Sequence, residues 1–508
     1  MTLESNLTAF AQAVAADVKA LSTGRGLVAS QLGVSASAAD NTAALAAIAS
    51  ARQTLTGRVV IDLPPGTIKG RLAMAPGVVW RLNGTRIVFP DSGPTGHMAY
   101  PLNPNWWGDE DGLGAHRSGI VGEGVLDGEQ SRWGLNPMPK PAMPTLATAA
   151  GTLAAGWYGY RIAYKTTFGI GAPSDEQNIE LTASGGVKLT WTNPAAAAAA
   201  QIVVSGRTPW DLASGMRTLA TLPSGSTTWT DSGSVTPTGP VARLVDLSAP
   251  AGIVMTGTEW TLRGIKVEGA CGTGIASQFN GESEASAPLA RLMEARIESV
   301  GVERPGAEGI VLAGVHDITV RGCFISRPGA TAPEPRSAVI ANANGPFVLA
   351  DTHTWGTSKW CVENYCGGDI VNCQLEGGLV GAANLQERTR MIGCEVFHPI
   401  AAGAKGVVIG NAGYKPVVQI ENTLFRMFNS SHGPAIDITN AGAGSRISGV
   451  AIQDTGTVIA GSTANKSVDI TVNGSASAQA VRPVVQLTQA AYDALATKHA
   501  TTLYVIVG

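Results

Sequence analysis

The stretch Ile318-Thr319-Val320-Arg321-Gly322-Cys323-Phe324-Ile325 places apolar side chains at alternate positions on either side of a small glycine. Alternation with period two is typical of a β-strand, and the glycine marks a bend. The pattern recurs through the C-terminal half at intervals of roughly 20 to 30 residues, as in a stacked repeat. Its small residue falls at Gly264, Gly322, Asn372, Gly393, Asn422 and Gly449, with weaker copies near 295 and 350.

A second strand motif keeps pace with the first, for example at 309–312, 406–409 and 435–438. Two or three short strands joined by turns therefore form one rung, meaning one turn of a solenoid. A single rung cannot bury its apolar side chains, but rungs stacked about 4.8 Å apart bury them and pair the backbone groups. The sequence predicts an all-β protein built on a right-handed parallel β-helix.

The composition excludes several classes of protein. The chain has 508 residues, a net charge of −3 and only 14% charged residues, so we expect no nucleic-acid partner. No apolar run reaches the roughly 18 residues of a membrane-spanning helix, so we expect no membrane insertion. The residues 1–5 lack the basic and apolar regions of a signal peptide.

The six cysteines do not form a CxxC pair, and no histidine cluster accompanies them. We therefore predict no metal site and no cofactor. Cys323, Cys373 and Cys394 share one position of the repeat. A small thiol packs well inside a bend of the solenoid, so we expect these cysteines to stack as buried thiols.

Three segments near the start of the chain, 40–45, 59–67 and 77–85, resemble the first part of the pectate-lyase-like β-helices of bacteriophage tailspikes. The resemblance covers about 40–136 and 242–475. It implies a helix at the first segment that caps the open end of the solenoid, with Asp40 or Asn41 as its N-cap. It also implies a homotrimer that attaches to other phage tail or baseplate proteins through its N-terminus.

Prolines between 137 and 144 and again at 237 and 240 bound a region of different composition. Strand-like alternation at 152–162, 187–192, 202–204 and 227–233 predicts a small β-sandwich inserted in the solenoid, which resembles fibronectin-type-III-like modules. Four aromatic side chains are expected in its core, with an exposed platform for carbohydrate as the alternative. They are Trp157, Tyr160, Trp191 and Trp229.

The two ends of the chain predict helices. Apolar residues between Leu3 and Leu21 form a seam on one face of an N-terminal helix, which needs a partner because isolated helices this short are marginal. Thr488 begins a predicted C-terminal helix and 502–507 a strand, an ending that resembles phage tail proteins. We predict domains at 1–26, 27–136, 137–241, 242–478 and 479–508.

Two zones carry candidate catalytic and glycan-binding residues. Glycosidases need two carboxyl groups about 5–9 Å apart, and aromatic rings often bind sugars. The first zone contains Trp106, Trp107, Asp109, Glu110, Asp111, Asp127 and Glu129. The second contains Asp351, His353, Trp355, Trp360 and Glu363. The segment 120–128 resembles a structural stretch of polygalacturonase-like β-helices, but their catalytic motifs do not follow it.

These observations leave three hypotheses for function. The leading one is a phage virion tail protein, a tailspike or fibre, that recognises host cell-surface polysaccharide and is assembled in the host cytoplasm. The second is a polysaccharide depolymerase, either a glycoside hydrolase or a lyase, which two acids on adjacent rungs facing one groove would favour. The third is a purely structural virion component.

Overall fold

The computed structural model describes most of the chain between residues 27 and 506. The described ranges are 27–54, 57–102, 116–207, 216–237, 246–277, 292–313, 315–329, 332, 334–342, 346–397, 401–411, 414–426, 431–453, 458–462, 466–473, 484–487, 489–494 and 503–506. The chain divides into two compact units, 1–344 and 345–508, and each is described by itself. The predicted N-terminal helix at 1–26 lies outside the described residues.

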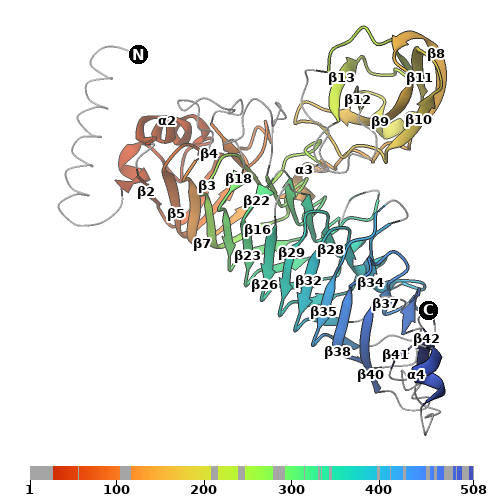
Figure 1. Cartoon of the computed structure of the whole chain (residues 1–508). Helices are drawn as coiled ribbons and strands as arrows, with labels where there is room; N and C mark the ends of the chain where they lie inside the picture. Colours follow the sequence, from red (N-terminus) through yellow and green to blue (C-terminus); the bar gives the residue numbers. More distant parts are fainter. Residues whose placement is uncertain are drawn as a thin grey trace. The chain divides into compact units, whose positions relative to one another are not determined.

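The first unit contains a parallel β-helix, whose stacked strands are visible in Figure 1. Its first sheet comprises β1 (Leu27–Val28), β2 (Val59–Leu63), β3 (Gly66–Lys69), β5 (Val78–Val88), β7 (Gly119–Asp127), β16 (Thr261–Glu268), β19 (Arg296–Glu298), β20 (Gly301–Glu303), β23 (Ile318–Arg321) and β24 (Phe324–Ser326). Its second comprises β4 (Leu72–Met74), β6 (Ala99–Pro101), β15 (Ile253–Met255), β17 (Ile275–Ser277), β21 (Ile310–Ala313) and β25 (Val339–Asn342). β18 (Leu292–Met293) pairs with β22 (Val315–His316). The strands β7 and β16, which precede and follow the inserted sandwich, pair directly.

The second unit repeats this architecture. Its first set of parallel strands is β26 (Phe347–Ala350), β27 (His353–Trp355), β29 (Gly368–Val371), β30 (Gln374–Glu376), β32 (Thr389–Ile392), β33 (Glu395–Phe397), β35 (Gln419–Glu421), β36 (Leu424–Arg426), β38 (Arg446–Gln453) and β40 (Ser467–Asn473). Its second set is β28 (Trp360–Asn364), β31 (Gly381–Leu385), β34 (Lys405–Ile409), β37 (Ile436–Asp437) and β39 (Ile459–Ala460). The prediction of a parallel β-helix is confirmed.

The small position of the repeat is a bend with left-handed backbone. Gly264, Gly322, Gly393 and Gly449 have φ between 61° and 71°, and Asn372 and Asn422 have φ of 52° and 49°. Glycine and asparagine tolerate this conformation, which explains why they recur there. The two weaker copies were misplaced at 295 and 350, because the residues that bend are Ser299 and Asp351, with φ of 53° and 49°.

The inward side chains of both units form the apolar core. Ile265, Val267, Ile325 and Leu375 are at most 2% exposed. The prediction of buried thiols is confirmed, since Cys323, Cys373 and Cys394 are 2–3% exposed. Cys373 and Cys394 each donate to a backbone carbonyl of the preceding rung, those of Leu349 and Ile370 respectively.

A helix covers the first rungs, as the resemblance implied. α2 (Thr42–Arg52) follows the short 3-10 helix η1 (Ala29–Leu32) and packs Leu45, Ile48 and Ala49 inward. The backbone N–H of Thr42 donates to Asp40 Oδ1 at 2.7 Å, which satisfies one of the free amides of the first turn. The amide of Asn41 instead binds the carbonyls of Ser35 and Lys69, and so ties the helix start to β3.

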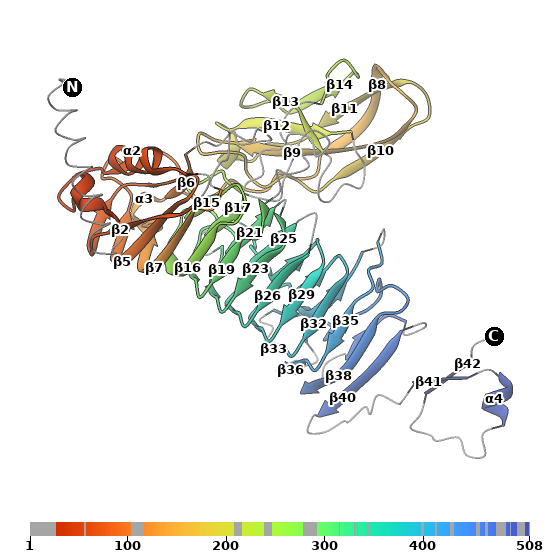
Figure 2. The same cartoon turned by 60° about the vertical axis from the view of Figure 1, so that its left-hand side comes forward.

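The insertion is a β-sandwich of two antiparallel sheets (Figure 2). β10 (Gln177–Leu181), β9 (Gly156–Lys165), β12 (Gln201–Gly206) and β13 (Arg217–Leu222) form one sheet. β14 (Thr228–Asp231), β11 (Gly185–Thr190) and β8 (Thr145–Leu153) form the other. The short 3-10 helix η2 (Ala195–Ala197) lies between β11 and β12, and the short helix α3 (Gln130–Trp133) precedes the insertion. The predicted strand at 152–162 is interrupted, because β8 ends at Leu153 and β9 begins at Gly156, with a turn between them.

The aromatic residues of the sandwich follow the period of β9. Tyr160 and Trp191 lie in the core, and Trp229 packs partly buried against it. Trp157 is 45% exposed, so its prediction as a core residue was wrong. The even positions of β9, including Tyr160 and Tyr164, face the core, and the odd position 157 therefore faces outward.

The C-terminal segment combines β41 (Val484–Leu487), α4 (Gln489–Asp493) and β42 (Leu503–Ile506). The two strands pair in parallel, with Val484 opposite Leu503. The predicted strand is therefore present, and the helix is shorter than expected; its predicted N-cap, Thr488, lies outside the described residues. Among the described residues, no helix is both long and apolar enough to cross a membrane.

Candidate functional site

The first predicted zone is only partly visible. Trp106, Trp107, Asp109, Glu110 and Asp111 lie outside the described residues. Asp127 and Glu129 are described, and they lie at the end of β7 and at the start of α3. They remain candidate catalytic residues, and their surroundings decide what chemistry they support.

Asp127 begins a column of three carboxylates on successive rungs. The strand pairing places Glu268 of β16 directly beside Asp127 of β7, and Glu303 of β20 directly beside Glu268. Neighbouring strands lie about 4.8 Å apart, which is near the shortest separation of the two carboxyl groups in glycosidases, so the register brings these acids together. We call Asp127, Glu268 and Glu303 the acidic column. It meets the criterion of two acids on adjacent rungs.

Basic side chains neutralise the acidic column. Arg86 forms an ion pair with Asp127, Arg304 Nη2 lies 2.8 Å from Glu268 Oε1, and Lys266 Nζ lies 2.8 Å from Glu303 Oε2. Burial alone would raise the pKa of Glu268, but its bonds to Arg304 and Lys266 hold that pKa below the usual range. A glycosidase acid instead needs a raised pKa, so Glu268 is unsuited to that role.

Glu129 belongs to an adjoining chain of exposed ion pairs. Arg132 Nη1 lies 3.1 Å from Glu129 Oε2, and Arg132 Nη2 lies 2.9 Å from Asp91 Oδ1. Lys69 Nζ lies 2.6 Å from the other oxygen of Asp91. The hydrogen bonds from Lys69 and Arg132 lower the pKa of Asp91. Glu129 therefore sits in a row of alternating charges.

The second predicted zone is divided between the two sheets of the second unit. Asp351 lies at the bend before β27, and His353 and Trp355 lie in β27. Trp360 and Glu363 lie in β28, which belongs to the other sheet. His353 Nε2 lies 3.2 Å from Glu376 Oε2 on the next rung. The sequence neighbours of this zone thus divide between two surfaces.

Glu363 is held in a buried position. Its side chain is 3% exposed, and Lys359 Nζ lies 2.8 Å from its Oε1. The hydroxyl of Tyr365 donates to its Oε2 at 2.7 Å. Both oxygens of this carboxylate therefore have partners within the protein, as a buried charge requires.

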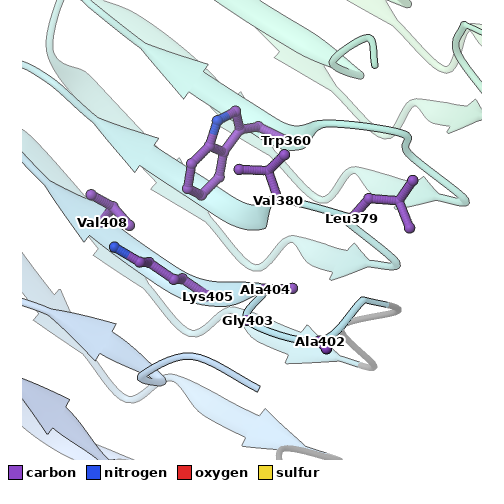
Figure 3. Close-up of a pocket in the computed structure, with 8 residues that line it drawn as sticks. All are labelled: Trp360, Leu379, Val380, Ala402, Gly403, Ala404, Lys405 and Val408. Atoms are coloured by element: carbon purple, nitrogen blue, oxygen red, sulfur yellow. The ribbon is translucent and has the colours of Figure 1, made fainter. Parts of the chain in front are cut away.

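Trp360 lines a cavity of about 360 Å³ on the second unit (Figure 3). We call this cavity the Trp360 hollow. Its walls are mainly aliphatic. The residues that form them are Trp360, Leu379, Val380, Ala402, Gly403, Ala404, Lys405 and Val408. Leu379 and Val380 are 37% and 41% exposed, whereas Trp360 is 8% exposed. The hollow therefore has an exposed apolar rim and a buried aromatic wall.

The register of three strands positions the aromatic wall of the hollow. Trp360 of β28, Gly381 of β31 and Lys405 of β34 lie directly beside one another on consecutive rungs. Gly381 contributes no side chain, and a Cβ atom there would come within 2.1 Å of Trp360 Cζ3. Gly381 therefore leaves room for the indole ring of Trp360, which forms one wall of the hollow.

A polar pair lies beside this apolar surface. Lys405 Nζ lies 2.9 Å from Asp437 Oδ2, and Asp437 is next to Val408 in the strand register. Burial would raise the pKa of Asp437, but hydrogen bonds from Lys405 and Thr439 lower it below its usual range. The pair therefore presents an ammonium donor and a carboxylate acceptor at neutral pH.

Sequence reasoning identified Trp360 but missed the rest of the hollow. Val408 and Asp437 lie in the second strand motif, at 406–409 and 435–438, whose alignment could have placed them on successive rungs. Leu379 and Val380 lie in a connection without periodicity, so no pattern marked them. Among the residues that the structure describes, no group of three or more His, Cys, Asp or Glu side chains could hold a metal ion.

Comparison with known proteins identifies one family by sequence. The model of the phage tail tip domain family matches residues 484–507, which contain β41, α4 and β42. The match covers a small part of the chain. No curated protein matches the sequence.

Several solved structures match the chain at low identity and low TM-score. The family 28 exopolygalacturonase of Yersinia enterocolitica is 9% identical, over 88% of this chain and 78% of that one, with a TM-score of 0.42. The Streptococcus pneumoniae surface protein and adhesin PfbA is 10% identical, over 88% and 96%, with a TM-score of 0.42. The gp54 tailspike of Acinetobacter baumannii bacteriophage AP22, solved with capsular saccharide, is 9% identical, over 86% and 72%, with a TM-score of 0.29. These are distant likenesses, and the strand pairing of the chain itself establishes its fold.

Proposed function

We propose that this chain is a tail protein of a bacteriophage virion, a tailspike or fibre, that recognises a host cell-surface glycan. The observation that carries the proposal is the phage tail tip domain match at residues 484–507. The parallel β-helix supports it, because stacked rungs present a long regular surface to an extended polymer. The Trp360 hollow adds a small apolar site on that surface.

Binding to cells tests this proposal. The labelled full-length protein is incubated with a panel of bacterial strains, before and after periodate oxidation of their surface sugars. We expect retention on at least one strain and its loss after periodate treatment. Retention that survives periodate, or that is lost when surface proteins are digested instead, would contradict glycan recognition.

A second function, glycoside hydrolysis, is favoured by one observation. Asp127, Glu268 and Glu303 lie on adjacent rungs in register. The ion pairs of these acids and the lowered pKa of Glu268 oppose it. We therefore rank cleavage below recognition. An assay of reducing ends released from host polysaccharide separates the two.

The assembly of the protein is also a proposal. We infer a homotrimer in which the segment 1–26 attaches to other tail or baseplate proteins, because its apolar seam between Leu3 and Leu21 requires a partner. Light scattering of the intact chain should give a trimeric mass, and removal of 1–26 should abolish attachment. A monomeric mass for the intact chain would overturn the trimer.

A further inference from the structure

We propose that the Trp360 hollow binds a single neutral sugar unit that carries an N-acetyl group, with the acetyl methyl against Trp360 and Val380. This inference rests on the proposed function, since it names the sugar chemistry that one site on the solenoid recognises. Three properties of the hollow carry it: its size, its apolar walls and its charge.

The size of the hollow fits one sugar ring or less. Its volume of about 360 Å³ is near the lower end of ligand pockets, which span roughly 300–1,000 Å³. Leu379 and Val380 form an exposed rim, so a ligand reaches the hollow from solvent. A polymer can therefore lie across the rim while one substituent enters.

The walls favour a methyl group over a hydroxyl group. Trp360, Val380, Ala402 and Val408 supply apolar surface, and a buried hydroxyl without a partner would cost free energy there. Figure 3 shows the indole of Trp360 beside Val380, with the Lys405 side chain extending toward Val408. A methyl group that fills such a site gains affinity through burial of apolar area.

The charge favours a neutral ligand. Lys405 is paired with Asp437 at 2.9 Å, so the only ammonium among the residues lining this hollow is already balanced. A sugar hydroxyl both donates and accepts hydrogen bonds, and a Lys–Asp pair offers both complements. A free carboxylate on the sugar would instead meet the negative charge of Asp437.

Saturation-transfer NMR on the full-length protein tests this inference, with N-acetylglucosamine as the probe and glucose as its matched control. We expect the strongest saturation at the acetyl methyl and a much weaker signal for glucose. Val380→Asp should weaken binding of the probe about tenfold or more, since a charge would replace apolar wall. Equal saturation of the two sugars would overturn the proposal.

A second valine provides the matched control variant. Val417 is 40% exposed in the same unit but does not line the hollow, so Val417→Asp should leave binding unchanged. Both variants should keep the circular dichroism and thermal midpoint of the parent, because both valines are exposed. The sugar assignment would be overturned if the Val380→Asp variant bound the probe as well as the parent does. It would also be overturned if copies of the chain associated with one another and this substitution abolished that association.

The two proposals fail in different ways. If labelled protein binds cells through periodate-sensitive glycan but the probe shows no acetyl saturation, the hollow is not the acetyl site and the proposed function stands. If the acetyl signal depends on Val380 but cells are not bound, the proposed function fails and the site remains.

Discussion

The acidic column and the Trp360 hollow are both columns of side chains on consecutive rungs, yet they have opposite contents. In the acidic column every rung supplies a carboxylate, and Arg86, Lys266 and Arg304 neutralise the three acids. Beside the hollow the middle rung supplies only Gly381, and the indole of Trp360 occupies the place that a side chain would take there. The solenoid stacks paired charges in the first column and omits a side chain in the second, where it makes room for an aromatic wall.

This difference shows that acidic residues in register are a poor guide to function. The acids of the column have basic partners that stabilise their charged forms. The hydrogen bonds and positive charges of these partners lower the pKa of Glu268, whereas an unpaired neighbouring acid would raise it. The hollow has only one ion pair at its edge, and it also has a buried aromatic side chain and an exposed apolar rim. Each prediction below tests one side of this contrast.

The largest effect is expected at a third set of charges, which is buried inside the first unit. It measures how much buried ion pairs contribute to the stability of that unit. Arg336 Nη2 lies 3.0 Å from Asp246 Oδ2, and Arg336 Nη1 lies 3.0 Å from Glu308 Oε1, with all three side chains at most 7% exposed. Arg336→Met should destabilise the unit by about 3–5 kcal/mol, because two buried carboxylates lose their cation. Urea unfolding measures this loss.

The control for this prediction is the way in which the stability of the Arg336→Met variant depends on pH. Burial raises the pKa of Asp246 although the charge of Arg336 opposes this, so the stability linked to this carboxyl is present in acid and is lost as pH rises through the folded value. The Arg336→Met variant should therefore be less destabilised in mildly acidic than in neutral solution. A loss below 1 kcal/mol at neutral pH, or one that grows on acidification, would contradict the buried ion pairs.

Filling the hollow should have the next largest effect. Gly381→Ala places a methyl group within 2.1 Å of Trp360 Cζ3, so the indole must move. We expect a destabilisation of about 1–3 kcal/mol, measured by thermal unfolding, together with loss of sugar binding. Gly301→Ala is the matched control, because its methyl would meet Lys266 Cγ at an ordinary 3.5 Å in another strand. Equal effects of the two substitutions would show that Gly381 does not maintain the hollow.

Breaking the acidic column should have a smaller effect. Glu268→Gln removes the charge that Arg304 and Lys266 contact, and we expect a loss of about 1 kcal/mol because the group is near the surface. Glu123→Gln, at an exposed position of β7, should change stability little. Chemical denaturation compares the two. Glycan binding should be unchanged in both, and loss of binding in Glu268→Gln alone would assign the column to the ligand site.

The smallest effect is expected at low pH, where the difference in stability between the parent and the Glu268→Gln variant should disappear. The folded pKa of Glu268 lies below its ordinary value of 4.5, so its contribution is present above that value and is lost as pH falls through the folded value. The stability of the parent and of the Glu268→Gln variant should converge below pH 4.5. A difference that persists in more acidic solution would contradict an ionised Glu268.

Much of the fold was predictable because stacking repeats one local pattern. Gly264, Gly322, Gly393 and Gly449 revealed the bend, since glycine suits its left-handed backbone. Ser299 and Asp351 adopt the same conformation without the glycine signal, so those two copies were misplaced. Trp157 was misplaced because it was expected in the core together with Tyr160, although the two residues have opposite parity in β9 and face opposite ways.

The site was predictable only in part, because its residues come from different rungs. Asp127 was identified, but Glu268 is beside it only because β7 and β16 pair across the inserted sandwich. Trp360 was identified as a possible sugar contact, whereas Gly381 and Lys405 carry no signal of their own and acquire meaning through the register. An aromatic wall that depends on an absent side chain one rung away has no sequence motif.

The release of reducing ends from a bound host polysaccharide tests the central claim most directly. The full-length protein is incubated with the polysaccharide of a strain that it binds, and reducing ends are counted over time beside the Glu268→Gln variant. The claim that the acidic column is structural and that the solenoid recognises glycan predicts saturable binding with no release above background in either protein. Release by the parent that the Glu268→Gln variant lacks would contradict it and would identify a polysaccharide depolymerase.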